Sequence, residues 1–297
     1  MNRTFGTLRR SALAAVAFAV TVASTLHAQQ RVERRIAVAG NVSVKIWIPA
    51  GSVRLIGWDR DSLVVEGTIG KGEAFFFGGA GAAAKFGVDE PPAGKPAQPA
   101  HLVAYIPRGG RVNVRTVGGS IESIDLSGWF NTVAGDIRLS GATDEVNAEA
   151  MDGSIHLDVV SPYARARTGS GALTAAGRVE DLSAATVSGP VTINTQGIVR
   201  GRFESVTGPI IVEAPLDRAA TIDIDNHNGS VELRLAASLL GDFDLTSVTG
   251  SITNRFDKRS AVVSRQGRGQ ELAFVTSPKG PRIVVRTFKG SIVLRRQ

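Results

Sequence analysis

The chain has 297 residues, of which 43% are hydrophobic and 6% aromatic, with 34 glycines and a formal net charge of +7. It contains no cysteine, which excludes disulfides and thiolate metal sites, so an apolar core and backbone hydrogen bonds must hold the fold. The basic residues are spread along the chain without an aromatic stacking platform, so we expect no nucleic-acid partner.

The first 28 residues have the order of a secretory signal peptide. Arg3, Arg9 and Arg10 form a basic start, and an uncharged apolar run over residues 11–26 follows. We expect cleavage after Ala28, which removes three arginines and lowers the net charge from +7 to +4. The apolar run is short for a membrane span, so we expect export to the periplasm, outer surface or medium without an integral span. An uncleaved membrane anchor is the competing interpretation.

Residues 29–110 are expected to form an N-terminal β cap and a first coil. Val42–Ile48 and Leu63–Ile69 have the composition of strands. Between residues 70 and 100 the pattern gives way to a Gly/Pro-rich loop insertion, because proline cannot join a central strand ladder. We expect Phe75–Phe77 in this insertion to fold over the end of the core, with a membrane or partner contact as the alternative.

A repeated phrase dominates the rest of the chain: a small polar residue, an apolar residue, a variable residue, glycine, a variable residue and an aliphatic residue. The phrase recurs nine times, with departures in single copies such as Ala150. Its glycines are Gly119, Gly135, Gly153, Gly171, Gly189, Gly208, Gly229, Gly250 and Gly290. Successive glycines lie 16 to 21 residues apart, except for a final gap of 40, which Gly269 divides and where we expect a degenerate copy. A period near 20 residues in Val-, Ile- and Thr-rich segments is typical of stacked β units.

The phase of each residue relative to its glycine predicts its environment. Apolar residues two and four positions after the glycine share a strand face and should form buried columns. The clearest pairs are Ile155 and Leu157, Val191 and Ile193, and Ile210 and Val212. The apolar residue two positions before the glycine is out of phase with the preceding strand, so the chain must bend there. The small polar residue three positions before it should form a ladder that satisfies backbone groups at this corner. These features predict an all-β fold, a parallel β-solenoid (β-helix) of about ten rungs with an irregular N-terminal cap, in which residues 111–297 form the regular repeats.

Catalytic and metal-binding motifs are sparse. The four histidines lack the spacing of a zinc site, and no serine lies in a Gly-x-Ser-x-Gly motif, so we expect no cofactor and no catalytic residue. The strongest case for chemistry is a group of carboxylates: Asp223 and Asp225 share one strand face, and Asp244 is expected one rung later beside Asp223. Such acids could support acid–base catalysis on a polysaccharide or bind calcium. Two or three acids on a polar strand face are also expected by chance.

The recurring Thr-Val-x-Gly-x-Ile units, the Gly-Ser-Val-Arg-Leu opening at residues 51–55 and the secretory leader resemble the bacterial putative-adhesin family. These are β-strand-repeat domains of unknown function, similar to the head domains of auto-transporter adhesins. The resemblance covers roughly residues 36–297 and implies a parallel β-solenoid outside the cytoplasm without catalytic residues. We therefore expect a non-catalytic, exported, adhesin-like binding or scaffold surface in the cell envelope, with an envelope polysaccharide or protein as partner. The alternative is a polysaccharide-acting enzyme or a calcium-binding face that uses Asp223, Asp225 and Asp244.

Overall fold

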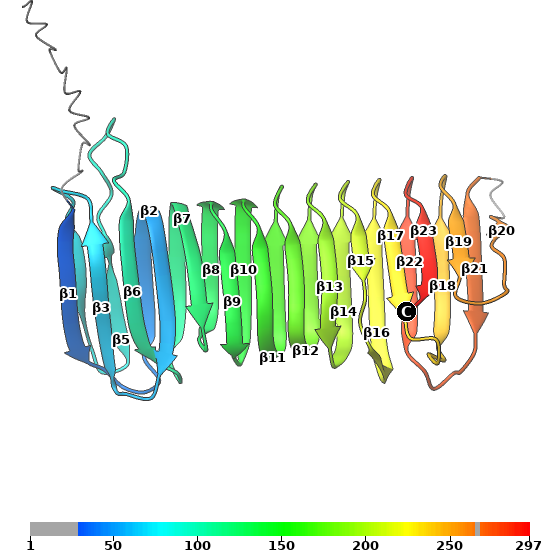
Figure 1. Ribbon diagram of the computed structural model, residues 1–297, viewed down its shortest axis with the longest axis horizontal. Helices are drawn as coiled ribbons and strands as arrows, with labels where there is room; N and C mark the ends of the chain where they lie inside the picture. Colours follow the sequence, from blue (N-terminus) through cyan, green and yellow to red (C-terminus); the bar gives the residue numbers. More distant parts are fainter. Residues whose placement is uncertain (1–28, 265–267) are drawn as a thin grey trace, which may run out of the picture.

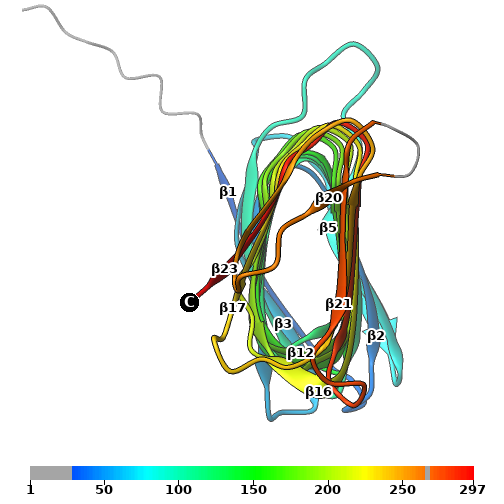
Figure 2. The same cartoon turned by 90° about the vertical axis from the view of Figure 1, so that its right-hand side faces the viewer.

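The computed structural model describes residues 29–264 and 268–297, so the expected signal peptide lies outside the described residues. Over those ranges the chain forms 23 strands and no helix, which confirms an all-β fold. The described residues therefore contain no membrane-spanning helix. The strands belong to one sheet, which is wound into a long tube with a flattened, oval cross-section (Figure 1 and Figure 2).

The strands differ widely in length, because some of them continue from one broad wall of the tube to the other without interruption. Their bounds are Gln30–Ala37 (β1), Ser43–Trp58 (β2), Ser62–Ile69 (β3), Phe75–Ala80 (β4), Ala83–Val88 (β5), Ala100–Pro107 (β6), Arg111–Ile124 (β7), Ser127–Ala134 (β8), Ile137–Ala142 (β9), Glu145–Asp152 (β10), Ile155–Thr168 (β11), Leu173–Thr186 (β12), Val191–Gln196 (β13), Ile198–Ser205 (β14), Ile210–Val212 (β15), Leu216–Asn226 (β16), Val231–Leu235 (β17), Asp242–Ser247 (β18), Ile252–Arg255 (β19), Val262–Val263 (β20), Gln270–Val275 (β21), Arg282–Thr287 (β22) and Ile292–Arg296 (β23).

β11 shows how one strand contributes to both walls. Its first half, from Ile155 to Val160, pairs in parallel with β9 and with the first half of β12. Its second half, from Tyr163 to Thr168, pairs in parallel with β10 and with the second half of β12. The backbone hydrogen bonds therefore run along the axis of the tube, and the alternating apolar side chains of both walls meet inside it.

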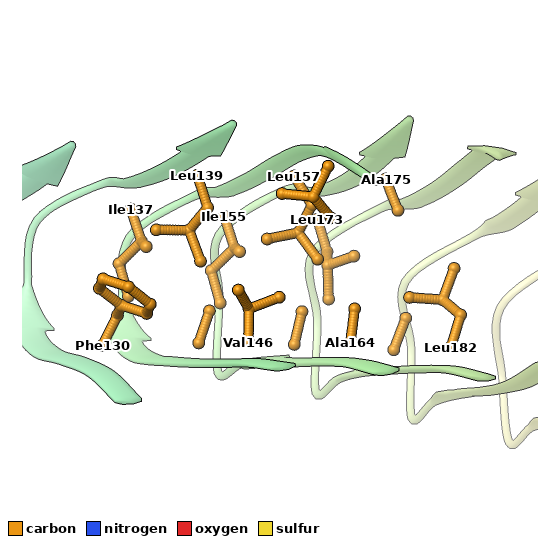
Figure 3. Packing of buried hydrophobic residues seen from close by; sticks show 14 of the residues in the cluster. Phe130, Ile137, Leu139, Val146, Ile155, Leu157, Ala164, Leu173, Ala175 and Leu182 are labelled. Atoms are coloured by element: carbon orange, nitrogen blue, oxygen red, sulfur yellow. The ribbon is translucent and has the colours of Figure 1, made fainter. Parts of the chain in front are cut away.

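The core is the line of apolar side chains between the two walls (Figure 3). The register places Ile137, Ile155, Leu173 and Val191 in one column, since each pairs with the next. The six residues predicted to be buried are each at most 1% exposed: Ile155, Leu157, Val191, Ile193, Ile210 and Val212. The predicted inward phase of the repeats is therefore confirmed for these positions.

The repeat glycines lie where successive turns of backbone come too close for any side chain. A Cβ atom built on Gly171 would lie 2.0 Å from the carbonyl oxygen of Gly153, and one on Gly189 would lie 1.8 Å from that of Gly171. Real Cβ contacts are not this short, so any larger residue would force two turns of the tube apart. Close approach of backbones explains why glycine recurs at this corner of each repeat.

The predicted fold class, a parallel β-solenoid of about ten rungs with an irregular N-terminal cap, is wrong. The tube is a closed arrangement of parallel strands with additional antiparallel strands at both ends. The antiparallel pairs are β1–β3, β3–β6 and β4–β5 at one end, and β18–β21 and β20–β21 at the other. Only the strands between these ends follow the all-parallel pattern that the repeats predict.

The order of the strands in space also departs from their order in the chain. β22 lies between β16 and β18, and β23 lies between β17 and β19, so the last copy of the repeat is inserted into the stack. The expected degenerate copy around Gly269 does not form a parallel unit, because β21 runs antiparallel to β18. The last copy can be inserted because every copy has the same corner and the same buried apolar pair, so any two copies can be neighbours.

The N-terminal region supplies strands that the repeats do not. β2 pairs with β7 on one side, and on the other side its two halves pair with β5 and β6. Part of the segment expected to be a loop forms the β4–β5 hairpin, whereas residues 90–99 contain no strand. Phe75 and Phe77 pack against the core and are partly buried, which confirms the expectation for these two phenylalanines.

Candidate functional site

An exposed row of large apolar side chains follows one corner of the tube, and we call this row the apolar edge. Its members stand two positions before repeat glycines, where the bend turns them outward. They are 37% to 68% exposed and, in spatial order, are Val117, Val133, Met151, Val187, Val206, Phe288 and Val248. Gly169 takes this position between Met151 and Val187, and His227 takes it between Val206 and Phe288. Contiguous apolar side chains on a protein surface are typical of interaction sites.

Backbone hydrogen bonds hold the apolar edge in its order. The amide of Val187 donates to the Gly169 carbonyl at 3.1 Å, and the amide of Thr207 donates to the Val187 carbonyl at 2.8 Å. Further along, the Lys289 amide donates to the His227 carbonyl at 2.9 Å, and the Thr249 amide donates to the Phe288 carbonyl at 2.9 Å. The edge is therefore built on a continuous ladder and not on separate loops.

The polar residues beneath the apolar edge belong to the fold. The hydroxyl of Thr116 donates to the Gly119 carbonyl at 2.8 Å, and the hydroxyl of Thr287 donates to the Gly290 carbonyl at 2.8 Å. Asn226 replaces threonine in one copy; its amide donates to the Gly208 carbonyl at 2.9 Å and its Oδ1 accepts from the Gly229 amide at 2.7 Å. The predicted ladder that satisfies corner backbone groups is confirmed for these copies.

Two shallow grooves run beside the apolar edge. The larger, of about 700 Å³, extends from Trp47 to Val187, with Thr116, Thr132, Ala150, Thr168 and Thr186 as its floor. Val117, Val133 and Met151 line it on one side, and the outward residues Arg115, Asn131, Glu149 and Arg167 line it on the other. The second groove, of about 480 Å³, includes His227 and Phe288, whose rings stack with centroids 5.0 Å apart. His227 thus occupies the position of an apolar edge residue in its copy, and its ring packs on the neighbouring Phe288.

A second surface lies near the N-terminal end of the tube, and we call it the basic aromatic groove. It is defined by Lys45 and Trp47 on β2, Phe76 on β4, Lys85 on β5 and Arg115 on β7, around a space of about 520 Å³. Asp89 and Asn113 also line it. Within the described ranges none of the three cations forms a salt bridge, and the Lys85 Nζ atom lies 6.0 Å from the centroid of the Phe76 ring.

The sequence does not show this groove directly, because its residues come from four strands and lie up to 70 positions apart, from Lys45 to Arg115. The register that joins them, with Lys45 beside Lys85 and Trp47 beside Arg115, involves the irregular N-terminal strands. The signal that could have found it is the run Lys45-Ile46-Trp47, in which a cation and an aromatic residue alternate with a core residue on an outward strand face.

The carboxylates singled out from the sequence do not converge as expected. Asp223 on β16 and Asp244 on β18 are both paired with Val284, because β22 lies between their strands. The expectation that they occupy neighbouring rungs is therefore wrong, and two strand spacings, about 10 Å, separate their backbones. Asp225 shares the outward face of Asp223 on β16, as predicted. Among the described residues, no group of three or more His, Cys, Asp or Glu side chains could hold a metal ion.

The neighbours of Asp223 and Asp225 are cations. Arg202 on β14 pairs with Asp223, and Arg286 on β22 pairs with Asp225. The pKa of Arg202 is raised above its ordinary value, chiefly by its hydrogen bond and charge interaction with Glu204, and further by Asp225 and Asp223. This face therefore has the alternating charges of a solvated sheet surface.

No protein-family model matches the chain, and no curated protein matches it. The solved structures that are similar to it include the following three. A putative lipid binding protein from Parabacteroides distasonis is 14% identical with a TM-score of 0.51, covering 89% of this chain and 96% of that one. A putative adhesin from Bacteroides fragilis is 10% identical with a TM-score of 0.45, covering 90% and 98%. A putative cell adhesion protein from Clostridium sporogenes is 8% identical with a TM-score of 0.26, covering 90% and 100%.

At these identities the likeness to the first structure concerns the fold alone, and the other two add no argument to it. Proteins described as a putative adhesin and a putative cell adhesion protein are nevertheless among the structures similar to this chain.

Proposed function

We propose that this chain is an exported, non-catalytic, adhesin-like binding protein of the cell envelope, and that the apolar edge is the surface that holds its partner. The observation that carries the proposal is the single row of seven exposed apolar side chains along one corner of the tube. A ligand that covers such a row gains free energy from burying apolar surface. Because the row stands on a hydrogen-bonded ladder, little ordering is required when the partner binds.

The separation of Asp223 from Asp244 favours a binding role over an enzymatic one. Catalysis on a polysaccharide uses two carboxyl groups placed on either side of one bond, in a cleft that holds the sugar. In the described part of the chain Asp223 and Asp244 are separated by Val284, and their neighbours Arg202 and Arg286 carry the opposite charge. The grooves beside the apolar edge suit an extended partner laid along the tube.

Export is supported by the sequence of the first 28 residues, which begins with a basic segment and continues with a short apolar run. The same feature supports a location in the periplasm, on the outer surface or outside the cell.

The proposal is tested by cosedimentation of purified protein, residues 29–297, with the envelope fraction of the producing cells. We expect the bound fraction to fall strongly when Met151 and Val187 are both changed to serine, because both side chains are exposed on the apolar edge. Val160→Ser is the matched control, since Val160 is 56% exposed but lies at the other bend of β11. Equal binding by the edge variant, the control and the parent would overturn the assignment of this surface.

A further inference from the structure

The basic aromatic groove brings together chemistry that the apolar edge lacks. Lys45 and Lys85 are paired across β2 and β5, and Trp47 and Arg115 are paired across β2 and β7. Lys45, Lys85 and Arg115 are exposed, whereas Trp47 is half-buried. Since residues two apart on a strand share a face, Lys45 and Trp47 point outward together.

A glycine in β5 makes room for a second aromatic ring beside Trp47. Gly87 pairs with Trp47 on one side and with Phe76 on the other. A Cβ atom built on Gly87 would lie 2.8 Å from Cζ of Phe76, so the Phe76 ring lies over this residue. Trp47 and Phe76 therefore form a half-buried aromatic platform on which the apolar face of a sugar ring can pack.

The positive charges of Lys45, Lys85 and Arg115 around this platform favour an anionic ligand. Three cations line the groove, and within the described ranges none of them forms a salt bridge. A ligand carboxylate would relieve their mutual repulsion, and the planar guanidinium of Arg115 can hold it through two parallel hydrogen bonds. Asp89 and Asn113 add hydrogen-bonding groups suited to hydroxyls.

The position of the groove favours a polymer. Trp47 and Arg115 line both the basic aromatic groove and the larger groove beside the apolar edge, so the two grooves are adjacent. A chain of sugars bound at the platform can extend along the tube from there. An anionic amphiphile would use the cations but not the hydroxyl-binding groups Asp89 and Asn113.

We propose that the basic aromatic groove binds acidic sugar residues of an envelope polysaccharide, with Trp47 and Phe76 packing on the ring and Lys45, Lys85 and Arg115 binding the carboxylate. This inference rests on the proposed function and names a ligand class for it. It also assigns a site separate in chemistry from the apolar edge.

The test is isothermal titration of the protein, residues 29–297, with oligogalacturonate and alginate oligomers as acidic probes and with methyl-esterified oligogalacturonate as the neutral match. We expect at least one acidic probe to bind about tenfold or more tightly than the neutral one, with affinity falling as salt rises. Lys85→Gln and Arg115→Gln should each weaken acidic binding by about three- to fivefold. Trp47→Ala should weaken it by about tenfold, and Trp47→Phe should restore most of it.

Lys279→Gln is the matched control, since Lys279 is exposed and lies outside the groove. Circular dichroism melting of each variant checks that it is folded. No binding of either acidic probe, or binding that Lys85→Gln and Lys279→Gln weaken equally, would overturn the inference. Binding of palmitate or of anionic phosphatidylglycerol vesicles through Lys85 and Arg115, without oligosaccharide binding, would replace it with an amphiphile site. Envelope binding that depends on Met151 and Val187 but is accompanied by no acidic-sugar binding would leave the proposed function standing and remove this inference.

Discussion

Truncation of Leu294 tests whether the last strand is inserted into the stack. Leu294 on β23 is fully buried and lies between Leu233 of β17 and Asn254 of β19. Leu294→Ala removes three carbon atoms from the core, which costs about 2.4 kcal/mol in transfer free energy at about 0.8 kcal/mol each. Strands hydrogen-bonded on both sides cannot close the gap fully, so a cavity remains and raises the expected loss to about 3–4 kcal/mol.

Urea unfolding measures this loss as a fall in the transition midpoint, expected to be about 1 M or more. The control is Val293→Ala on the same strand, because Val293 points outward and is half-buried; its cost should stay below about 1 kcal/mol. A strand that only closed the end of the tube would lose contacts on one side and could relax. If Leu294→Ala costs no more than Val293→Ala, the inserted position of β23 is wrong.

Three further outcomes are expected. Gly171→Ala should lower the melting temperature markedly, because its Cβ atom would lie 2.0 Å from the Gly153 carbonyl oxygen. Gly72→Ala is the control in the same thermal scan: nothing lies within 4 Å of its Cβ atom but φ is +83°, so it shows the effect of backbone strain without a clash. The double change of Asp223 and Asp244 to asparagine should leave the urea midpoint nearly unchanged, and a calcium-dependent rise in melting temperature that the double variant loses would contradict this. The hydrogen bond from Arg234 and the charges of Arg234 and Arg295 hold the pKa of Glu232 below its ordinary value of 4.5. A lowered carboxyl pKa stabilises the fold above the unfolded pKa and loses that effect as pH falls through the folded pKa. Glu232→Gln should therefore be less stable than the parent at pH 7, and the difference in urea midpoint should shrink as the pH falls below 4.5; a constant difference would show that the ion pair has no part in it.

The sequence predicts those features of the fold that depend on position within one repeat. Ile193 is buried because it stands four residues after its glycine, and Thr186 bonds at the corner because it stands three residues before it. Both relations are local, since strand alternation and the bend at the glycine act within a few residues. They hold for any copy, whichever neighbours it has.

The same equivalence of copies hides which copy lies beside which. The order of the chain predicts that the corner of Gly250 lies beside that of Gly229. The corner of Gly290 fits there equally well, and the structure places Gly290 between Gly229 and Gly250. This one insertion explains two errors together, the order of the last units and the supposed adjacency of Asp223 and Asp244. The insertion of β22 also depends on the gap of 40 residues between Gly250 and Gly290. This length lets the chain form β21 on one side of β18 and then return to form β22 on the other side.

The side chains of the apolar edge are not needed for the repeat to fold. The repeat has glycine at the corner and, except for Ala150, a hydrogen-bonding residue three positions before it. It places no demand on the residue two positions before the glycine, which points to solvent. Gly169 and His227 occupy that position in two copies without breaking the ladder. Valine, methionine and phenylalanine at the other copies are therefore not needed for folding, and an exposed apolar group there slightly favours aggregation. Seven of the nine copies nevertheless carry a large apolar side chain at this position, which supports the proposal that the apolar edge is kept for a partner.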